Sequence, residues 1–284
     1  MGASLLDKIL ITGARGFVGS SLCEKLSHDF DVIQYNRGDN IKKINNIKPN
    51  YLIHCAGEIY DKNLMFNSNV VLTHELLNIV KDLKNFKNFV YIGSSSEYGR
   101  KPNHIKESDS LEPDTIYEGT KACGSLLTRV FGKTYDFNTT IVRPFSLYGE
   151  KEQKHKFFSH LFDSFTKNNK VKLINGVHDW IHIDDFVNGV EIATLENKIS
   201  GEVYHFGNGV QYTNFEVFDI FCKIFQKEID FEIVKNHDGK SAGVESKSWV
   251  ADINKVKKTL NWYPKYKLKE GILKLINFRR GDEQ

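Results

Sequence analysis

The sequence contains no run of apolar residues long enough to cross a membrane. Its longest apolar runs have the length of strands, far below the roughly 18 residues that a membrane-spanning helix needs. The first residues, 1–8, lack the charged segment followed by an apolar one that marks a secretion signal. We therefore expect a protein without membrane contact and with a cytoplasmic location.

Cysteine is also scarce, and the four residues present lie far apart: Cys23, Cys55, Cys123 and Cys222. None belongs to a CxxC pair, and no cysteines and histidines share the spacing of a zinc site. This spacing argues against a disulfide framework and gives no support to a metal centre. We expect buried free thiols.

Neither an excess of one charge nor a flexible linker is present. The formal net charge is +3, from 39 Lys and Arg against 36 Asp and Glu, and the lysines are scattered among acidic residues. Such a distribution gives little support to nucleic-acid binding. The sequence has no repeat, low-complexity stretch or Gly/Ser-rich linker, so a second domain would have to grow out of insertions in the first.

The first half of the chain shows a regular alternation of two kinds of segment. Short runs rich in Val, Ile and Tyr, typical of strands, cover 8–12, 31–35, 51–56, 89–93 and 140–143. Helix-length segments such as 18–26 and 69–83 lie between them. Strands and helices that alternate in this way form parallel sheets with right-handed crossovers. We predict an α/β fold with a Rossmann-type doubly wound parallel sheet.

Beyond Gly149 the alternation becomes less regular. Helices are predicted over 157–168 and 215–227, and strands over 203–206 and 231–234. These segments indicate a smaller C-terminal α/β lobe that binds the substrate. We place the Rossmann domain at 1–149, with returning segments near 179–207, and the smaller lobe at 150–178 and 208–284.

A glycine-rich turn directly follows the first predicted strand and opens a helix, which is the context of a dinucleotide-binding fingerprint. Its glycines let the backbone turn sharply and approach a pyrophosphate, whose charge is stabilised by the amides at the helix start. An ordinary tight turn would not need three glycines at this spacing. We predict contacts to NAD(P) from Gly13, Arg15, Gly16, Phe17, Val18 and Gly19.

The end of the second strand lacks the carboxylate that usually accepts the ribose hydroxyls of NAD. The chain has Tyr35-Asn36-Arg37 there. Arg37, together with Arg15, has the fork geometry that suits a 2′-phosphate, although both would also serve as solvated loop residues. We favour NADP(H) over NAD(H), count Asn36 among the cofactor contacts, and place Asp39 and Asn40 at the adenine.

Tyr117 and Lys121 stand four residues apart at the start of a predicted helix, so their side chains share one face. An adjacent ammonium and an oxidised nicotinamide ring favour the phenolate, which makes Tyr117 a usable acid/base. Lys121 is also suited to bond the nicotinamide ribose. Ser94, just past a strand, would donate a hydrogen bond to the substrate oxygen. A surface pair is the plain alternative, but the serine-ended strand favours a catalytic site.

These motifs, taken in order, resemble the extended short-chain dehydrogenases/reductases, especially the NAD(P)-dependent sugar-nucleotide epimerases, dehydratases and reductases. The similarity covers nearly the whole chain, through segments 12–19, 51–57, 69–70, 93–99, 117–121, 142–149, 180–185, 205–209 and 249–252. The resemblance implies that Ser94, Tyr117 and Lys121 are catalytic. It also implies that Ala56, Gly57 and Pro144 line the cofactor.

Departures from the family pattern narrow the reaction. The 4,6-dehydratases carry an acid where this chain has Ser96, and Glu97, one residue along, would point the other way on an extended segment. Reductases of GDP-4-keto sugars share the arginines of the glycine turn and second strand. These reductases also epimerise the carbons next to the ketone, with a cysteine and a histidine as acid and base. This chain has Ser96 in the place of the cysteine, and a serine hydroxyl is too weak an acid for that role without activation. His155 falls near the histidine's place, where a solvated loop residue is the alternative.

The chain lacks the arginine that usually binds the substrate phosphates in this family. Family members often carry it just before the motif at 179–180, where this chain has His178, and no arginine occurs between Arg143 and Arg279. His178 with Lys240 or Lys247 would hold a diphosphate as point charges. The candidate substrate contacts are Ser95, Ser96, Ser146, His155 and His178.

The combined pattern favours reduction of a 4-keto(-6-deoxy) nucleotide-linked sugar, with Tyr117 as the acid/base. An NAD-dependent nucleotide-sugar 4-epimerase is the rival within the class, and a non-catalytic dinucleotide-binding regulator is the rival outside it. Family members commonly pair through two helices, here 69–83 and 117–131, so we expect a homodimer. Asp184 or Asp185 is better suited to fixing the loop between lobes than to touching substrate.

Overall fold

The computed structural model describes residues 6–196, 200–234 and 248–282. Its larger part is a six-stranded parallel sheet with the order β2-β1-β3-β4-β5-β9. The strands are β1 (Lys8–Thr12), β2 (Asp31–Tyr35), β3 (Tyr51–His54), β4 (Asn88–Ile92), β5 (Thr139–Pro144) and β9 (Glu202–Phe206). This arrangement confirms the predicted Rossmann-type doubly wound sheet.

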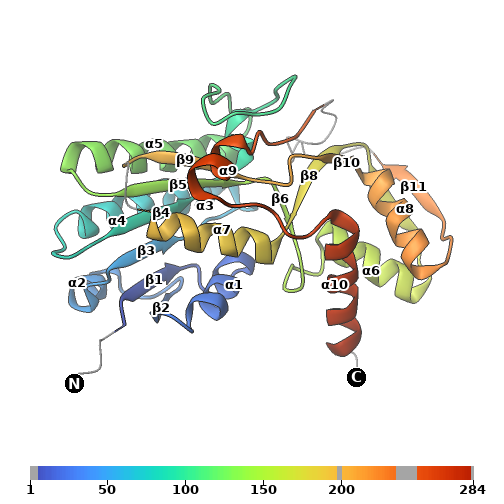
Figure 1. The fold of residues 1–284 in the computed structure, drawn as a ribbon, viewed down its shortest axis with the longest axis horizontal. Helices are drawn as coiled ribbons and strands as arrows, with labels where there is room; N and C mark the ends of the chain where they lie inside the picture. The colour runs from blue at the N-terminus through green and yellow to red at the C-terminus, as the bar shows by residue number, and fades with distance from the viewer. Residues whose placement is uncertain (1–5, 197–199, 235–247, 283–284) are drawn as a thin grey trace.

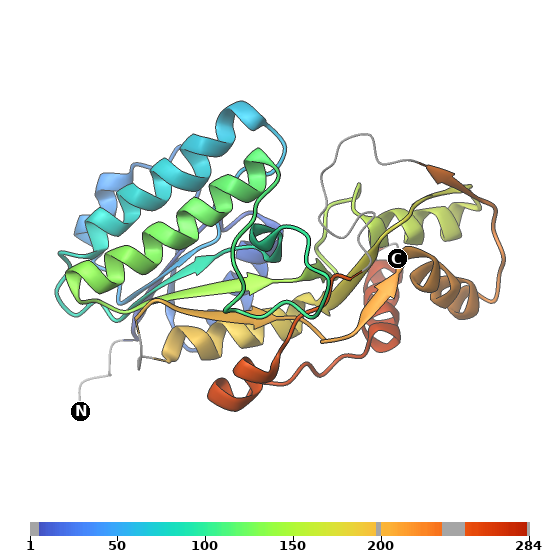
Figure 2. The same cartoon turned by 90° about the horizontal axis from the view of Figure 1, so that it is seen from above.

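Helices cover both faces of this sheet, and Figure 2 shows α4 and α5 on one side and α7 on the other. One face carries η1 (Ile41–Lys43), α2 (Ile44–Ile47), α3 (Lys62–Phe66), η2 (Asn67–Val71), α4 (Leu72–Val80) and α5 (Ile116–Tyr135). The other carries α1 (Phe17–Leu26) and α7 (Ile183–Leu195). Side chains alternate between the faces: Ile9 and Ile11 join one core cluster and Leu10 the other.

A second group of elements lies beside the sheet, on the right in Figure 1. It contains a three-stranded sheet of β10 (Gln211–Thr213), β8 (Val177–His182) and β6 (Ser146–Tyr148), and a parallel pair of β7 (Val171–Ile174) and β11 (Phe231–Val234). Helices α6 (Phe157–Lys167), α8 (Asn214–Phe225) and α10 (Leu268–Asp282) pack into an aromatic-rich core with them, and α9 (Asn254–Leu260) packs on β9.

Most predicted elements exist with bounds shifted by a few residues, and strands 8–12, 31–35 and 231–234 match the structure. The predicted strand 203–206 is β9, which pairs with β5 in the large sheet and therefore belongs with the returning segment instead of the smaller lobe. The predicted helix 69–83 is interrupted, because the chain forms α3, the π-helical turn η2 and then α4. The division near residue 149 stays a prediction.

The four cysteines are free thiols, but the prediction that they are buried holds only for Cys23, since Cys55 and Cys222 are half-buried and Cys123 is exposed. Cys123 is exposed because it lies on the outer face of α5, where no other described element covers it. Among the described residues, no helix is both long and apolar enough to span a membrane.

Candidate active site

The glycine turn between β1 and α1 has the geometry of a phosphate cradle. Gly13 has φ +64°, and a Cβ there would lie 2.8 Å from the Ala56 Cα. A Cβ on Gly19 would lie 2.2 Å from the Gly13 carbonyl oxygen, so only glycine fits at both places. Gly16 is the N-cap of α1, and no described side chain caps this end. The first amides of α1 therefore remain available to an anion.

This turn forms one wall of a cavity of about 530 Å³. The other walls come from the residues after β3, β4 and β5 and from the loop before α6, so the cavity lies at the carboxyl ends of the parallel strands. Ten of the fifteen predicted catalytic and cofactor residues line it: Gly13, Gly16, Phe17, Val18, Gly19, Gly57, Ser94, Tyr117, Lys121 and Pro144. The other five, Arg15, Asn36, Arg37, Asp39 and Ala56, and the five predicted substrate contacts are not part of its lining. The structure thus brings the catalytic residues and the glycine turn together at one cavity.

Tyr117 and Lys121 project from the first turns of α5, which begins with a capping box between Thr115 and Glu118. Tyr117 and Ser94 line the same cavity, and burial raises the pKa of Tyr117 to about 12 against the opposing effect of Ser94. The Lys121 ammonium donates to the Ile92 carbonyl at 2.5 Å. Burial lowers the pKa of Lys121 to about 8.

The sequence predicted an extended segment after β4. The structure instead shows the short 3-10 helix η3 (Ser95–Tyr98) there. Ser94 is its N-cap, because its Oγ accepts from the Ser96 amide at 3.2 Å and lies 2.7 Å from the Ser96 hydroxyl oxygen. Ser95 is buried, and neither Ser95 nor Ser96 lines the cavity, although both were predicted to contact the substrate. Ser96 is linked to the cavity through the hydrogen bond between its hydroxyl and that of Ser94.

Glu97 is fully buried behind Ser94, so it is absent from the cavity lining. One carboxylate oxygen accepts the Ser94 amide at 2.8 Å, and the other accepts from the Arg143 Nε at 2.9 Å. The carboxylate is thus engaged by the backbone and by a buried guanidinium. Glu97 therefore does not face the cavity, and the cause is this pairing instead of the extended backbone that the sequence predicted.

The residues predicted to meet the adenosine end of the cofactor are bonded to one another and to the glycine turn. The Arg15 amide donates to the Asn36 Oδ1 at 3.0 Å, and the Asn36 amide donates to the Asp39 carboxylate at 2.7 Å. The Arg37 guanidinium, however, donates to the Glu58 carboxylate at 3.0 Å. Sequence reasoning missed Glu58, although an acid just after β3 was the available signal.

His178 and Ser146 contact each other across β6 and β8, with 3.0 Å between the Ser146 Oγ and the His178 Nδ1. Burial lowers the pKa of His178 to about 4, so its ring is neutral near pH 7. It therefore supplies no charge to a diphosphate, contrary to the prediction, because its ring packs beside Trp180 at 4.6 Å between centroids. Lys240 and Lys247, its predicted partners, lie outside the described residues.

His155 lies in the exposed loop before α6, and its Nε2 is 2.6 Å from the Tyr60 hydroxyl. Tyr60 comes from the loop after β3 and also donates to the Gln153 Oε1 at 3.1 Å. Lys156, the N-cap of α6, has its ammonium 5.6 Å from the centre of the Tyr60 ring, and both residues line the cavity. Tyr60 and Lys156 were not predicted, because neither belongs to a recognisable motif.

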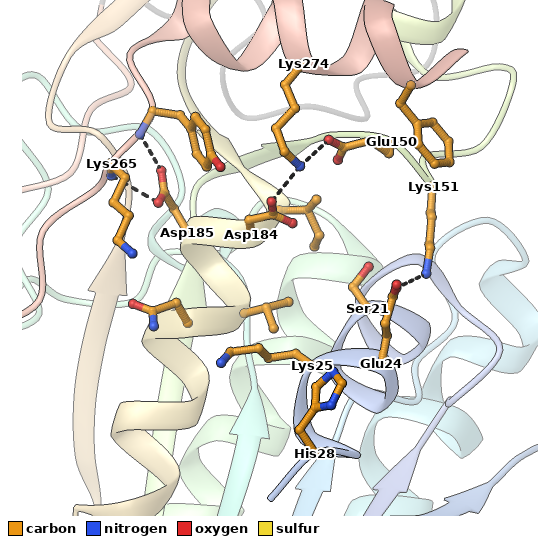
Figure 3. A pocket seen from close by; sticks show the side chains of 15 residues that line it. Ser21, Glu24, Lys25, His28, Glu150, Lys151, Asp184, Asp185, Lys265 and Lys274 are labelled. Carbon is orange, nitrogen blue, oxygen red and sulfur yellow. Dashed lines mark hydrogen bonds and ion pairs between the residues drawn. The ribbon is translucent and has the colours of Figure 1, made fainter. Parts of the chain in front are cut away.

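A second cavity, of about 760 Å³, lies between α1, α7 and α10 (Figure 3). The Lys274 ammonium of α10 contacts the carboxylates of Glu150 and Asp184, at 2.6 Å each. Asp185 accepts the amides of Lys265 and Tyr266, both at 3.0 Å. Asp185 thus holds the backbone of the segment before α10, whereas Asp184 pairs with a side chain of α10.

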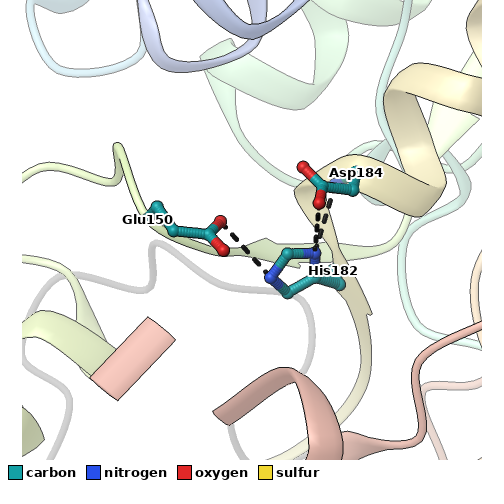
Figure 4. A group of neighbouring side chains, drawn as sticks. All are labelled: Glu150, His182 and Asp184. Atoms are coloured by element: carbon teal, nitrogen blue, oxygen red, sulfur yellow. Dashed lines mark hydrogen bonds and ion pairs between the residues drawn. The ribbon is translucent and has the colours of Figure 1, made fainter. Parts of the chain in front are cut away.

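Glu150, Asp184 and His182 also form a group with possible metal ligand atoms within 4.8 Å of one another (Figure 4). The His182 Nδ1 accepts the Asp184 amide at 3.2 Å, which leaves the Nε2 to face Glu150 at 3.3 Å. The Lys274 ammonium already bridges the two carboxylates. A positive charge from the chain itself thus stands where a metal ion would have to bind.

A Rossmann-type sheet, an open glycine cradle and a Ser/Tyr/Lys group at one cavity define a dinucleotide-dependent oxidoreductase of the short-chain dehydrogenase/reductase class. The chain belongs to the NAD dependent epimerase/dehydratase family, whose model matches residues 9–207. It is therefore an enzyme of the extended type in that class, as the sequence predicted.

Three similar proteins illustrate the breadth of this family. An uncharacterised UDP-glucose epimerase of Bacillus subtilis, YtcB, is 25% identical over 313 positions, covering 95% of this chain and 97% of the relative. The structure of UDP-glucuronic acid 4-epimerase from Bacillus cereus with UDP-glucuronic acid and NAD has a TM-score of 0.86 at 24% identity, covering 96% and 99%. The structure of dTDP-glucose 4,6-dehydratase from Bacillus anthracis with NAD has a TM-score of 0.85 at 22% identity, and the match covers 98% of this chain and 97% of that one.

Proposed function

We propose that this enzyme moves a hydride between a nicotinamide cofactor and a carbon of a nucleotide-linked sugar. The observation that carries the proposal is that Ser94, Tyr117 and Lys121 line the same cavity as the glycine cradle. When bound, the nicotinamide ring supplies or accepts the hydride. Tyr117 moves the proton of the reacting oxygen, Ser94 donates a hydrogen bond to that oxygen, and Lys121 holds a positive charge beside them.

Two reactions fit these residues. The first is reduction of a 4-keto(-6-deoxy) sugar, which needs Tyr117 alone as proton donor. The second is 4-epimerisation, in which one carbon is oxidised and reduced again with retained cofactor. Two of the three similar proteins are named as epimerases, which supports epimerisation at least as strongly as reduction. Dehydration is the weakest candidate, because Ser96 stands at the position of the acid and Glu97 is paired with Arg143.

We propose NAD(H) as the cofactor, in place of the NADP(H) that the two arginines suggested. Arg37 is paired with Glu58 and is therefore not a free cation for a 2′-phosphate. Both solved structures compared above contain NAD. The residues that would hold the dinucleotide are those of the glycine cradle, with Asn36 and Asp39 at the adenosine end and Lys121 at the nicotinamide end.

We propose that Lys156 takes over part of the diphosphate binding that the neutral His178 cannot supply. Its side chain lines the catalytic cavity, and the residue caps the start of α6, where helix amides and the helix dipole favour an anion. A lysine at this point acts as a point charge and does not need the fixed fork geometry of an arginine.

We also infer a homodimer formed through the outer faces of α4 and α5. An apolar stripe runs along α5 through Ile116, Leu126 and Val130, which are 54%, 50% and 57% exposed. Exposed apolar side chains in a row typically mark a protein contact. We also propose a cytoplasmic location.

The function is tested by mass spectrometry of the ligand bound to the native protein, followed by assays with UDP, dTDP, GDP and CDP sugars and their 4-keto forms. A reductase consumes reduced cofactor in proportion to product, whereas an epimerase converts its sugar with no net change in nicotinamide absorbance. Tyr117→Phe should lower kcat by about 10²- to 10⁴-fold and leave cofactor binding intact. Unchanged turnover in this variant would favour a non-catalytic regulator instead.

A further inference from the structure

We infer that Glu58 sets the choice of dinucleotide: its carboxylate neutralises Arg37 and makes the adenosine end of the site selective for a cofactor without a 2′-phosphate. This inference rests on the proposed dinucleotide-dependent function and names a residue that no motif of the sequence singles out. It is supported by how Glu58 is held, by what its carboxylate contacts, and by the charges around Arg37.

The backbone of Glu58 is fixed by one buried side chain. The Asn69 Oδ1 accepts the Glu58 amide at 2.8 Å, and the Asn69 Nδ2 donates to the Glu58 carbonyl at 3.0 Å. Asn69 is 1% exposed and also donates to the Thr120 hydroxyl at 3.0 Å. Glu58 therefore has a fixed place between the end of β3 and the start of α5.

The carboxylate of Glu58 is fixed and charged. Its Oε1 accepts the amides of Ile59 and Tyr60, both at 3.0 Å, and that of Asp61 at 3.3 Å. The backbone hydrogen bond from Tyr60, followed in importance by the bond from Arg37, lowers the pKa of Glu58 against the opposing effect of burial. The group is consequently ionised at neutral pH, with its Oε2 directed to Arg37.

The pair joins two strand ends that are not neighbours. Arg37 follows β2, Glu58 follows β3, and β1 with its glycine turn lies between them in the sheet. In sites that select NAD, the carboxylate that contacts the ribose normally comes from the end of β2. In this chain a carboxylate from the β3 end is brought to the same region, so the acid is absent from its usual place in the sequence but not from the site.

The guanidinium at the end of β2 is paired without a phosphate. Arg37 contacts the Glu58 carboxylate at 3.0 Å, and the Asp39 carboxylate adds a second negative charge at the same strand end, where it accepts the Asn36 amide. A 2′-phosphate would bring between one and two further negative charges and would have to compete with Glu58 for the Arg37 guanidinium. Glu58 lines the cofactor cavity and Arg37 is the more exposed partner, with side-chain exposures of 14% and 74%. The fixed acid would thus repel the phosphate while retaining the arginine.

The test is a measurement of dissociation constants for NADH and NADPH, by nicotinamide fluorescence, on the full chain and its variants. The wild type should bind NADH more tightly. Glu58→Gln keeps an acceptor for the three amides and removes the charge, so the affinity for NADPH relative to NADH should rise by about tenfold or more. The double variant Glu58→Gln/Arg37→Gln should lose this gain, because the freed guanidinium causes it.

Asp82→Asn is the matched control, since Asp82 pairs with Lys81 at the amino end of the sheet and should leave the ratio unchanged. A wild type that already prefers NADPH, or a Glu58→Gln ratio within about twofold of wild type, would overturn the role of Glu58 while the proposed function stands. Failure of both dinucleotides to bind would overturn both. If Glu58→Gln does not fold, Arg37→Gln decides: it should barely change NADPH affinity, and an approximately tenfold loss would contradict the neutralised pair.

Discussion

At the scale of single residues, the active site combines two ionisable groups whose pKa values burial moves in opposite directions. The pKa of Tyr117 rises to about 12 and that of Lys121 falls to about 8. Both shifts disfavour the charged form of the group. The free enzyme therefore keeps the proton on Tyr117, and the positive ring of a bound oxidised nicotinamide favours its release. The Tyr/Lys spacing predicted this pair, but burial set its protonation.

Replacing Lys121 by methionine should stabilise the fold while it removes activity. Unfolded lysine binds a proton below pH 10.5, the buried one only below about 8, so wild-type stability falls as pH drops between these values. The cost of protonation at pH 7 should exceed that at pH 9.5 by about 2 kcal/mol. Urea unfolding at both pH values measures it: the advantage of Lys121→Met should be larger at pH 7. An equal gain in stability at both pH values would contradict the lowered pKa of Lys121. Lys133→Met, at an exposed position of α5, is the control.

At the scale of elements, the buried pair of Glu97 and Arg143 joins η3 to β5 directly behind Ser94. The Arg143 guanidinium also donates to the Tyr98 hydroxyl, which in turn lies 2.7 Å from the His205 Nε2. The catalytic serine thus rests on a polar network instead of an apolar core. Such a network is costly when one member is removed, because the partner charge stays buried.

Arg143→Met should destabilise the protein by about 3–5 kcal/mol, since it leaves the Glu97 carboxylate without its counter-charge. The double variant Glu97→Gln/Arg143→Met removes both charges and keeps an acceptor for the Ser94 amide. We expect it to recover more than half of the loss in urea denaturation. A double variant as unstable as Arg143→Met alone would show that the charge pair is not the cause.

The elements also show why periodicity alone predicted some bounds and missed others. The apolar pattern of 69–83 indicates one helix, but the chain inserts the π-helical turn η2 before α4. Asn69 lies in that turn, where its side chain bonds both Glu58 and Thr120. A tertiary contact of one side chain, which periodicity does not report, accompanies the change in helix type.

At the scale of the whole molecule, the proposed dimer predicts a defined response to surface charge. Leu126→Lys, alone or with Val130→Lys, places a charge in the exposed apolar stripe of α5 and should shift the protein to a monomer. Sedimentation velocity measures the change. Leu195→Lys, at the end of α7 with 46% exposure, is the control on another face and should leave the dimer intact. A wild type that sediments only as a monomer would remove the proposal.

The sequence by itself determined the doubly wound sheet, the glycine cradle and the Ser94/Tyr117/Lys121 group. These follow from local properties: the alternation of apolar runs, glycines at fixed spacing after a strand, and side chains four residues apart on one helix. Each can be recognised within a short segment, and parallel strands then bring their carboxyl ends to one cavity.

Only the tertiary structure decided how the remaining charges are paired. Glu58 meets Arg37 across 21 residues of chain, Glu97 meets Arg143 across 46, and Lys274 meets Asp184 across 90. His178 becomes a neutral core residue because Trp180 and the strands around it exclude water. Whether an arginine awaits a phosphate or is already neutralised depends on which distant side chain the fold places beside it. Spacing along the chain carries no information on that.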